Sequence, residues 1–211
     1  HVPQNAESQM IRPALHENIK IMSVGLFPNT DHVNILRGPM AANLVKQFLT
    51  NVDWGALDYL IIDFPPGTGD IQLTIAQAIP MTGAVVVTTP QEVALVDVRK
   101  AVRFFEKLSI PVLGVLETMS YFICDDCSKK HKIFSGAGAA GVAREFSIPM
   151  LGQIPMEAAM AAAGDSGKPL IFGKNTDSAS AMAYDAAARG LARQFSIRHS
   201  QGAGLESFEL I

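Results

Sequence analysis

The sequence has few of the features that mark several common functional classes. Two cysteines in 211 residues argue against a disulfide framework. Its 17 lysines and arginines are outnumbered by 20 aspartates and glutamates, so no basic excess points to nucleic acid or to an anionic membrane as a partner. The apolar runs are strand-sized and interrupted, which predicts neither a membrane-spanning helix nor a signal peptide. We therefore expect a cytoplasmic protein.

A phosphate-binding loop of the form Gly-x-x-x-x-Gly-Lys-Ser/Thr is also missing. The nearest segments are Gly-Lys-Pro at 167–169 and Gly-Lys-Asn at 173–175, and both lack the preceding glycine spacing. Neither is predicted to hold phosphates.

What the chain does contain is an alternation of strand and helix patterns. Uninterrupted apolar runs are typical of strands covered on both faces, and they occur at 59–62, 83–89, 111–116 and 149–154. Helical spacing of apolar residues is clearest at 94–108, with further helices expected at 138–146 and 176–195. This order predicts an α/β fold with a doubly wound, mainly parallel sheet flanked by helices. We expect one domain over 1–197 and a polar tail over 198–211.

The segment YLIIDFPPGTGD, from Tyr59 to Asp70, predicts a nucleotide site. The run 59–62 is expected to be a buried strand that delivers Asp63 into a loop rich in glycine and proline. Because ligands bind at the carboxyl ends of strands in such sheets, Asp63 is placed to hold a magnesium-bound water. The backbone of the following turn is predicted to contact a terminal phosphate at Pro66, Gly67, Thr68 and Gly69.

The same turn has a structural alternative. It could simply connect a strand to a helix that begins near Ile71, with Asp70 as the N-cap. Strands that end in aspartate are common, but the combined string favours the nucleotide site.

The two cysteines form a Cys-x-x-Cys pair, Cys124 and Cys127, which suits a thiolate metal site. Zinc could bind this pair together with His131, or with the same pair from a second subunit. A redox disulfide is another alternative, although the polar stretch that follows predicts a loop or hairpin rather than the helix start of thioredoxin-like motifs. The cysteines alone do not separate an iron-sulfur cluster from zinc.

Several strings occur along the chain in a family-specific order. They are Arg-Gly-Pro-Met at 37–40, Val-Asp-Trp-Gly at 52–55, the string at 63–70, Thr-Thr-Pro-Gln at 88–91, Met-Ser at 119–120, the cysteine pair and Gly-Asp-Ser-Gly-Lys-Pro at 164–169. Together they resemble the Mrp family of iron-sulfur carrier ATPases, in the larger group of dimeric ATPases that includes MinD and the nitrogenase iron protein. The resemblance covers about Ile21 to Pro169.

The resemblance implies a homodimer that binds ATP and Mg²⁺ between its subunits. It further implies that a 4Fe-4S cluster bridges the interface, that each subunit supplies Cys124 and Cys127, and that the cluster passes to client apoproteins. Thr118 stands where the family usually has an asparagine that recognises adenine, and threonine lacks the paired donor and acceptor of an amide. Asp165 lies where related ATPases approach the base or ribose.

The family also begins with a strand, a lysine-containing phosphate loop and a helix, whereas this sequence opens at His1 and reaches the middle of the family pattern by Ile19. We expect the loop to come from sequence upstream of His1, and no ATP hydrolysis without it. The alternative is a dimeric, non-catalytic scaffold that binds an iron-sulfur cluster or zinc. That scaffold would bind metal with no response to nucleotide.

Overall fold

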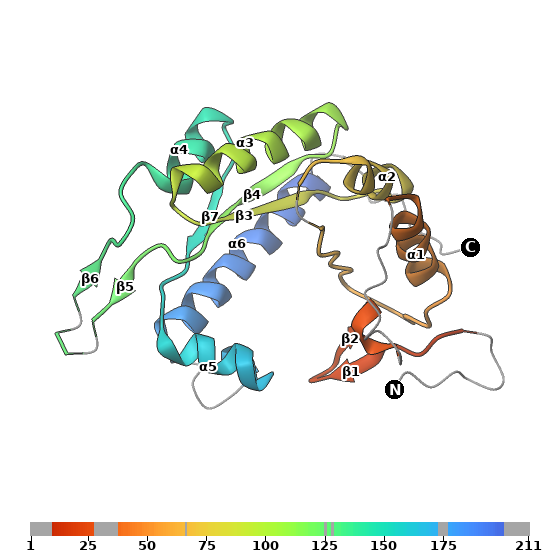
Figure 1. Ribbon diagram of the computed structural model, residues 1–211, viewed down its shortest axis with the longest axis horizontal. Coiled ribbons are helices and arrows are strands. Elements are labelled where there is room, and N and C mark those ends of the chain that lie inside the picture. Colours follow the sequence, from red (N-terminus) through yellow and green to blue (C-terminus); the bar gives the residue numbers. More distant parts are fainter. Residues whose placement is uncertain are drawn as a thin grey trace. The chain divides into compact units, whose positions relative to one another are not determined.

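The computed structural model describes residues 10–27, 38–65, 67–124, 126–127, 129–172 and 177–200 (Figure 1). The chain divides into two compact units, one formed by the described residues up to Pro80 and the other by those from Met81 onward. Among the described helices, none is both long and apolar enough to cross a membrane.

The second unit is built on a parallel three-stranded sheet in the order β3-β4-β7. These strands are β3 (Ala84–Thr88), β4 (Val112–Glu117) and β7 (Met150–Gln153). All three arise from continuous apolar runs, as expected for strands covered on both faces. The predictions of parallel strands within 83–89, 111–116 and 149–154 are confirmed.

Helices cover both faces of this sheet (Figure 1). Helices α3 (Glu92–Lys107) and α4 (Gly138–Glu145) pack on one face, and α6 (Ala179–Ser200) packs on the other. The core on the α3 side joins buried residues of α3, β3 and α4, namely Leu95, Val98, Val102, Val86 and Val142. The predicted α/β architecture is therefore confirmed. Helix α6 continues to Ser200, so its last three residues lie in the range predicted to be a tail.

An arginine joins the two helices on the outer surface of that face. Arg99 of α3 donates to Glu92 in its own helix and to Glu145 of α4, each at 2.8 Å. These hydrogen bonds, that to Glu145 first, raise the pKa of Arg99 above its usual value. Because the three side chains face water, the ion pairs contribute little to stability.

Three smaller elements complete the second unit. The strands β5 (Phe122–Ile123) and β6 (Lys130–His131) pair antiparallel as a hairpin that extends away from the sheet (Figure 1). Helix α5 (Ala158–Ser166) and the 3-10 turn η2 (Leu170–Phe172) lie between β7 and α6 along the chain. The prediction of a loop or hairpin after Ile123 is confirmed as a hairpin.

The first unit combines a short hairpin with two helices. Strands β1 (Ala14–His16) and β2 (Ile19–Ile21) pair antiparallel, and the 3-10 turn η1 (Val24–Leu26) follows them. The helices α1 (Gly38–Thr50) and α2 (Asp70–Ala78) pack against each other. Of these elements, only α2 was predicted. The two strands are only three residues long and lack an extended apolar run, so they leave no strand pattern in the sequence.

The segment after α1 carries the best-buried part of this unit. Val52 is 1% exposed and forms a parallel bridge with Ile11. Trp54 is also buried, and its indole Nε1 donates to the carbonyl oxygen of Phe48 at 2.8 Å. The Val-Asp-Trp-Gly string therefore has a structural role in anchoring the end of α1.

The predicted buried strand at 59–62 is wrong. These residues form no regular strand, and Ile61 is 88% exposed. A strand exists only where a neighbour offers its backbone groups, and within the described residues no strand pairs with 59–62. Strand β3 likewise pairs only with β4 in that part of the chain. Apolar composition alone could not supply the missing neighbour.

Two glycines packed near Leu151 give a test of the core. A Cβ on Gly114 in β4 would lie 2.6 Å from Leu151 Cγ and 2.9 Å from the carbonyl oxygen of Pro149, whereas one on Gly190 in α6 would make ordinary contacts at 3.7 and 3.8 Å. Gly114→Ala should therefore destabilise the second unit by about 1–3 kcal/mol in urea unfolding. Gly190→Ala should stabilise it by about 0.5–1 kcal/mol. Equal effects of the two variants would contradict this packing.

Candidate functional site

The glycine- and proline-rich loop of the first unit lies between the irregular segment at 59–65 and the start of α2. Gly67 has φ +97°, a conformation that side chains rarely adopt, so glycine is required there by the backbone rather than by lack of space. Gly67, Thr68 and Gly69 are exposed, and Pro66 lies outside the described residues. The helix begins at Asp70 with Gly69 as its N-cap, so the expected cap at Asp70 is off by one residue.

A buried glutamine holds this loop to the helix. The side chain of Gln72 accepts a hydrogen bond from the Gly69 N–H at 2.9 Å and donates to the carbonyl oxygen of Pro65 at 3.2 Å. It thereby ties together the two ends of the turn 65–69. Gln72 was not among the residues predicted from the sequence. Its position three residues after the cap residue Gly69 is half of a capping box, which is a pattern that the sequence does contain.

Asp63 precedes this loop and is exposed. Its carboxylate forms no hydrogen bond or ion pair with another described residue. The start of α2 lies at exposed residues and carries the positive end of the helix dipole, which favours an anion at the loop, although the Gly69 N–H is already bonded to Gln72. These features fit the residue types expected for Mg²⁺ and phosphate.

The carboxyl ends of the strands form an ordered edge in the second unit. The register places Thr88, Glu117 and Gln153 side by side as the last residues of β3, β4 and β7. Thr118 follows β4 and is held against β3, because its backbone N–H and its Oγ1 donate to the carbonyl oxygen of Thr88 at 2.7 and 3.3 Å. The predicted adenine-side residue therefore lies at the edge where α/β sheets bind ligands.

The middle residue of this row is a buried carboxylate that sequence analysis did not identify. Glu117 is 3% exposed, and one of its oxygens accepts from Ser120 Oγ and from Gln153 Nε2, the latter at 2.8 Å. Its other oxygen accepts from the backbone N–H of Ala139, in the first turn of α4, at 2.5 Å. No local pattern predicts this arrangement, since two of the three donors lie 22 and 36 residues away.

The cysteine pair lies at the tip of the β5–β6 hairpin. Cys124 is half-buried and its N–H donates to the carbonyl oxygen of Lys129 at 3.0 Å, while Cys127 is exposed. Both are thiols rather than halves of a disulfide. Soft thiolates so close in the chain are suited to an iron-sulfur cluster or zinc. Among the described residues, no group of three His, Cys, Asp or Glu side chains is arranged to hold a metal ion.

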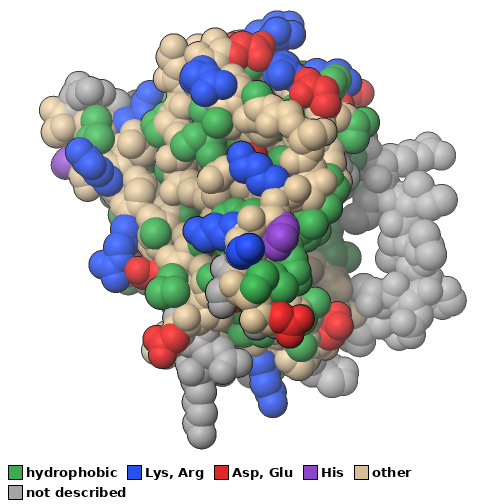
Figure 2. All heavy atoms as spheres, turned by 90° about the vertical axis from the view of Figure 1, so that its left-hand side faces the viewer, with side chains coloured by type: hydrophobic (Ala, Val, Ile, Leu, Met, Phe, Trp, Pro, Cys, Tyr) green, Lys and Arg blue, Asp and Glu red, His purple; other side chains and the backbone are tan. Residues whose placement is uncertain are grey.

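Basic residues flank the two thiols. Lys129, Lys130 and Lys132 are exposed, and the Lys130 ammonium lies 4.8 Å from the centre of the Tyr121 ring. Figure 2 views this side of the second unit and shows lysine and arginine side chains among apolar ones. The charge beside the pair is nevertheless mixed, because the exposed Asp126 lies between the two cysteines.

Asp165 lies in the last turn of α5, which ends at Gly167 in the left-handed conformation with φ +64°. Its side chain is exposed and forms no hydrogen bond or ion pair with another described residue. The Gly-Asp-Ser-Gly string therefore forms the end of a helix. The structure provides no contact between Asp165 and Thr118.

The predicted site residues thus fall into three groups. Asp63 and the turn at 67–69 belong to the first unit, while Thr118 and the cysteine hairpin follow the same strand, β4, in the second. Asp165 stands apart on α5.

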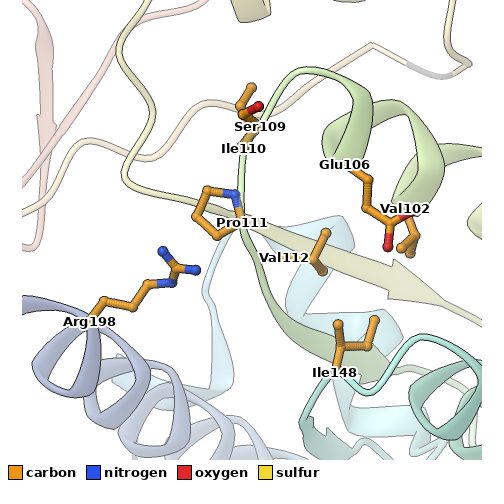
Figure 3. Close-up of a pocket in the computed structure, with 8 residues that line it drawn as sticks. All are labelled: Val102, Glu106, Ser109, Ile110, Pro111, Val112, Ile148 and Arg198. Carbon is orange, nitrogen blue, oxygen red and sulfur yellow. The ribbon is translucent and has the colours of Figure 1, made fainter. Parts of the chain in front are cut away.

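A pocket of about 320 Å³ lies elsewhere in the second unit (Figure 3). It is at the opposite end of β4, where Pro111 and Val112 begin the strand, and Arg198 of α6 and Glu106 of α3 line it. It contains none of the predicted site residues.

Comparison with solved structures defines the class. A nucleotide-binding protein from Archaeoglobus fulgidus, described in complex with ADP, matches with a TM-score of 0.68 and 34% identity, over 82% of this chain and 67% of that one. The cell division ATPase MinD of Pyrococcus furiosus matches with a TM-score of 0.53 and 21% identity, over 74% of this chain and 59% of that one, which shows the fold alone. The chain has the α/β fold of P-loop NTPases.

Sequence comparison then identifies the family. The NUBPL iron-transfer P-loop NTPase family matches residues 1–192, and the chain belongs to it. An iron-sulfur cluster carrier protein of Synechocystis sp. is 41% identical over 93% of this chain and 56% of its own length. The iron-sulfur cluster transfer protein NUBPL of Dictyostelium discoideum is 42% identical over 92% of this chain and 59% of its own length. The chain thus spans a little over half the length of these relatives.

The role of Gln72 in closing the loop is testable. Gln72→Ala removes the partners of the Gly69 N–H and the Pro65 carbonyl, which should destabilise the closed loop by about 1–3 kcal/mol. Hydrogen exchange of the Gly69 amide, followed by NMR, should accelerate accordingly. Gln77→Ala, at an exposed position of the same helix, is the control and should leave that amide unchanged. A slow Gly69 amide in the Gln72 variant would show that the loop closes by other means.

Proposed function

We propose that this chain acts in an ATP-dependent iron-sulfur cluster carrier, in which a homodimer binds a bridging 4Fe-4S cluster and passes it to client apoproteins. The observation that carries the proposal is the pair of thiols, Cys124 and Cys127, on a hairpin that extends away from the sheet. Family membership and the names of the relatives support the same cargo. A reducing compartment such as the cytoplasm suits thiolate ligands.

The number of thiols explains why a dimer is required. One chain offers two soft ligands, whereas a 4Fe-4S cluster takes four. A twofold axis beside the hairpin tip would bring the same two cysteines from a second copy. The cluster would then be held at an exposed edge that opens when the two subunits separate, which suits cargo that has to leave.

Nucleotide binding is the second half of the proposal. Asp63 would organise Mg²⁺ and water, and the turn at 67–69 would contact the terminal phosphate through its exposed backbone. Thr118 and Asp165 would lie toward the adenosine. Since threonine cannot pair with both edges of adenine, backbone groups at the end of β4 would supply part of that recognition.

The cargo is tested by anaerobic reconstitution with iron and sulfide. The wild-type chain should take up about two irons and two sulfides per chain and sediment as a dimer. Cys124→Ala should lose nearly all of this iron while its circular dichroism stays unchanged, because the side chain lies on a peripheral hairpin. Asp126→Asn, which changes an exposed carboxylate between the two cysteines and no thiol, is the control and should keep the iron.

Other outcomes of this experiment identify the alternatives. Full iron content in the Cys124→Ala dimer would exclude these thiols as the ligands. Uptake of zinc alone would favour a metal-binding scaffold.

The nucleotide is tested by equilibrium binding of ATP with and without Mg²⁺. Asp63→Asn should weaken the Mg²⁺-dependent binding by about tenfold or more, roughly 1.4 kcal/mol per factor of ten, and should leave iron uptake unchanged. Asp58→Asn, at another exposed aspartate in the same segment, is the control. Iron uptake by a wild-type chain that binds no ATP under either condition would favour the non-catalytic scaffold.

A further inference from the structure

We propose that Glu117 is a positioning residue for the cysteine hairpin, because its buried carboxylate holds together the two ends of the segment that carries Cys124 and Cys127. The effect of this role on cluster binding rests on the proposed function, whereas the positioning of the hairpin by Glu117 is independent of it. The hairpin leaves the body of the unit after Ser120 and returns at Ala139, and both residues donate to Glu117.

The two ends of the hairpin segment are attached in different ways. On the entry side the backbone itself is paired, since Ile154 N–H donates to the Glu117 carbonyl oxygen at 2.8 Å and Ser120 N–H donates to that of Ile154 at 3.0 Å. Met156 N–H continues this pairing to Tyr121 at 2.8 Å. The entry strand is therefore fixed by the neighbouring backbone.

The exit side has no comparable support. Within the described residues, no backbone hydrogen bond joins 132–136 to the sheet. The first attachment is the Ala139 N–H, which donates to the Glu117 carboxylate. This contact adds to the packing of α4, whose buried Val142 belongs to the core on the α3 side, and it ties the first turn of the helix directly to the end of β4. It also satisfies one of the unpaired N–H groups at the start of α4.

The local backbone is shaped to allow this contact. Gly138 has φ +57°, and a Cβ there would overlap Oε2 of Glu117, so both the backbone conformation and the space beside the carboxylate favour glycine. On the entry side Met119 adopts φ 52°, which is uncommon for a residue other than glycine. That turn allows the Ser120 hydroxyl to point back to Glu117. Both unusual conformations are explained by convergence on one carboxylate.

The chemistry of the site favours a carboxylate over its amide. Three donors, from Ser120, Gln153 and Ala139, meet two oxygens that only accept. A glutamine of the same shape would replace two charged acceptor oxygens by one neutral oxygen and one N–H₂ group. The hydrogen bonds to Ala139, Ser120 and Gln153 would then lose their charge assistance, even where the hydroxyl and the amide reorient to accept. Glu117→Gln is therefore the sharpest variant.

Glu157 offers a matched control in the same unit. Its carboxylate also accepts backbone N–H groups at a helix start, from Ala179 at 3.3 Å and Ser180 at 2.7 Å. These groups begin α6, and Glu157 itself directly follows Met156, which pairs with Tyr121 on the entry side. Glu157→Gln should therefore loosen a helix start of the same kind, close to the hairpin entry, while leaving the paired backbone and the exit contact at Ala139 in place.

The test measures the motion of the hairpin in protein that carries no cluster. The chain has two cysteines, so in a Cys124→Ser background a nitroxide attached to Cys127 labels the hairpin alone. Adding Glu117→Gln should shorten the rotational correlation time of the nitroxide at least twofold in the electron paramagnetic resonance spectrum, and should raise the hydrogen exchange rate of the Ala139 amide at least tenfold. Adding Glu157→Gln should change neither. An unchanged spectrum in a folded Glu117→Gln protein would overturn the proposal.

A second readout connects the position to the cargo. With both cysteines present, Glu117→Gln should release iron to a chelator at least fivefold faster than Glu157→Gln. If the wild type takes up no iron, the proposed function fails while the nitroxide result still decides the positioning role. If Glu117→Gln does not fold, Glu117→Asp keeps the charge but is too short to reach both ends, and it should shift the spectrum in the same direction; no shift would refute the role.

Discussion

The register of three parallel strands is the constraint on which the second unit depends. It aligns Thr88, Glu117 and Gln153 at the carboxyl end of the sheet. Thr118 and the segment that carries the two cysteines follow directly after this row. Thr118 is fixed against β3 by the carbonyl oxygen of Thr88. A shift of β4 by one residue would move the Glu117 side chain to the opposite face of the sheet, away from Ala139. The candidate ligand edge and the cysteine hairpin are therefore set by the same strand pairing.

Buried or half-buried polar side chains fix several of the other loops and helix starts. Gln72 joins the ends of the turn at 65–69, Glu117 joins the ends of the cysteine segment, and Glu157 caps α6. In each case a side chain within or beside a regular element satisfies backbone groups of a loop or helix start that would otherwise lack partners. Such contacts fix loops more firmly than surface ion pairs like those of Arg99, since a buried unpaired group is costly whereas an exposed ion pair is screened by water.

These contacts also explain what the sequence could and could not predict. Strands β3, β4 and β7 were predictable because burial on both faces leaves a continuous apolar run, and α3 because its apolar residues repeat at helical spacing. The run at 59–62 has the same composition, but strand formation also needs a partner, which a local pattern does not contain. Asp63, Thr118 and the two cysteines were proposed as site residues from their strings, and they remain predictions. Gln72 and Glu117 were missed, and for Glu117 the reason is physical, since its partners are distant in sequence.

The hairpin itself is too small to set its own position. Each of its strands has two residues, and an isolated hairpin of any length is only marginally stable in water. Its cysteines are nevertheless required to face a second set of ligands if a cluster is shared between two chains. An exposed site that is both accessible and oriented must therefore take its orientation from the base of the hairpin rather than from its tip. The base is where the paired backbone of 154–156 and the Glu117 carboxylate lie, so the rigidity of the sheet reaches the thiols through these two connections.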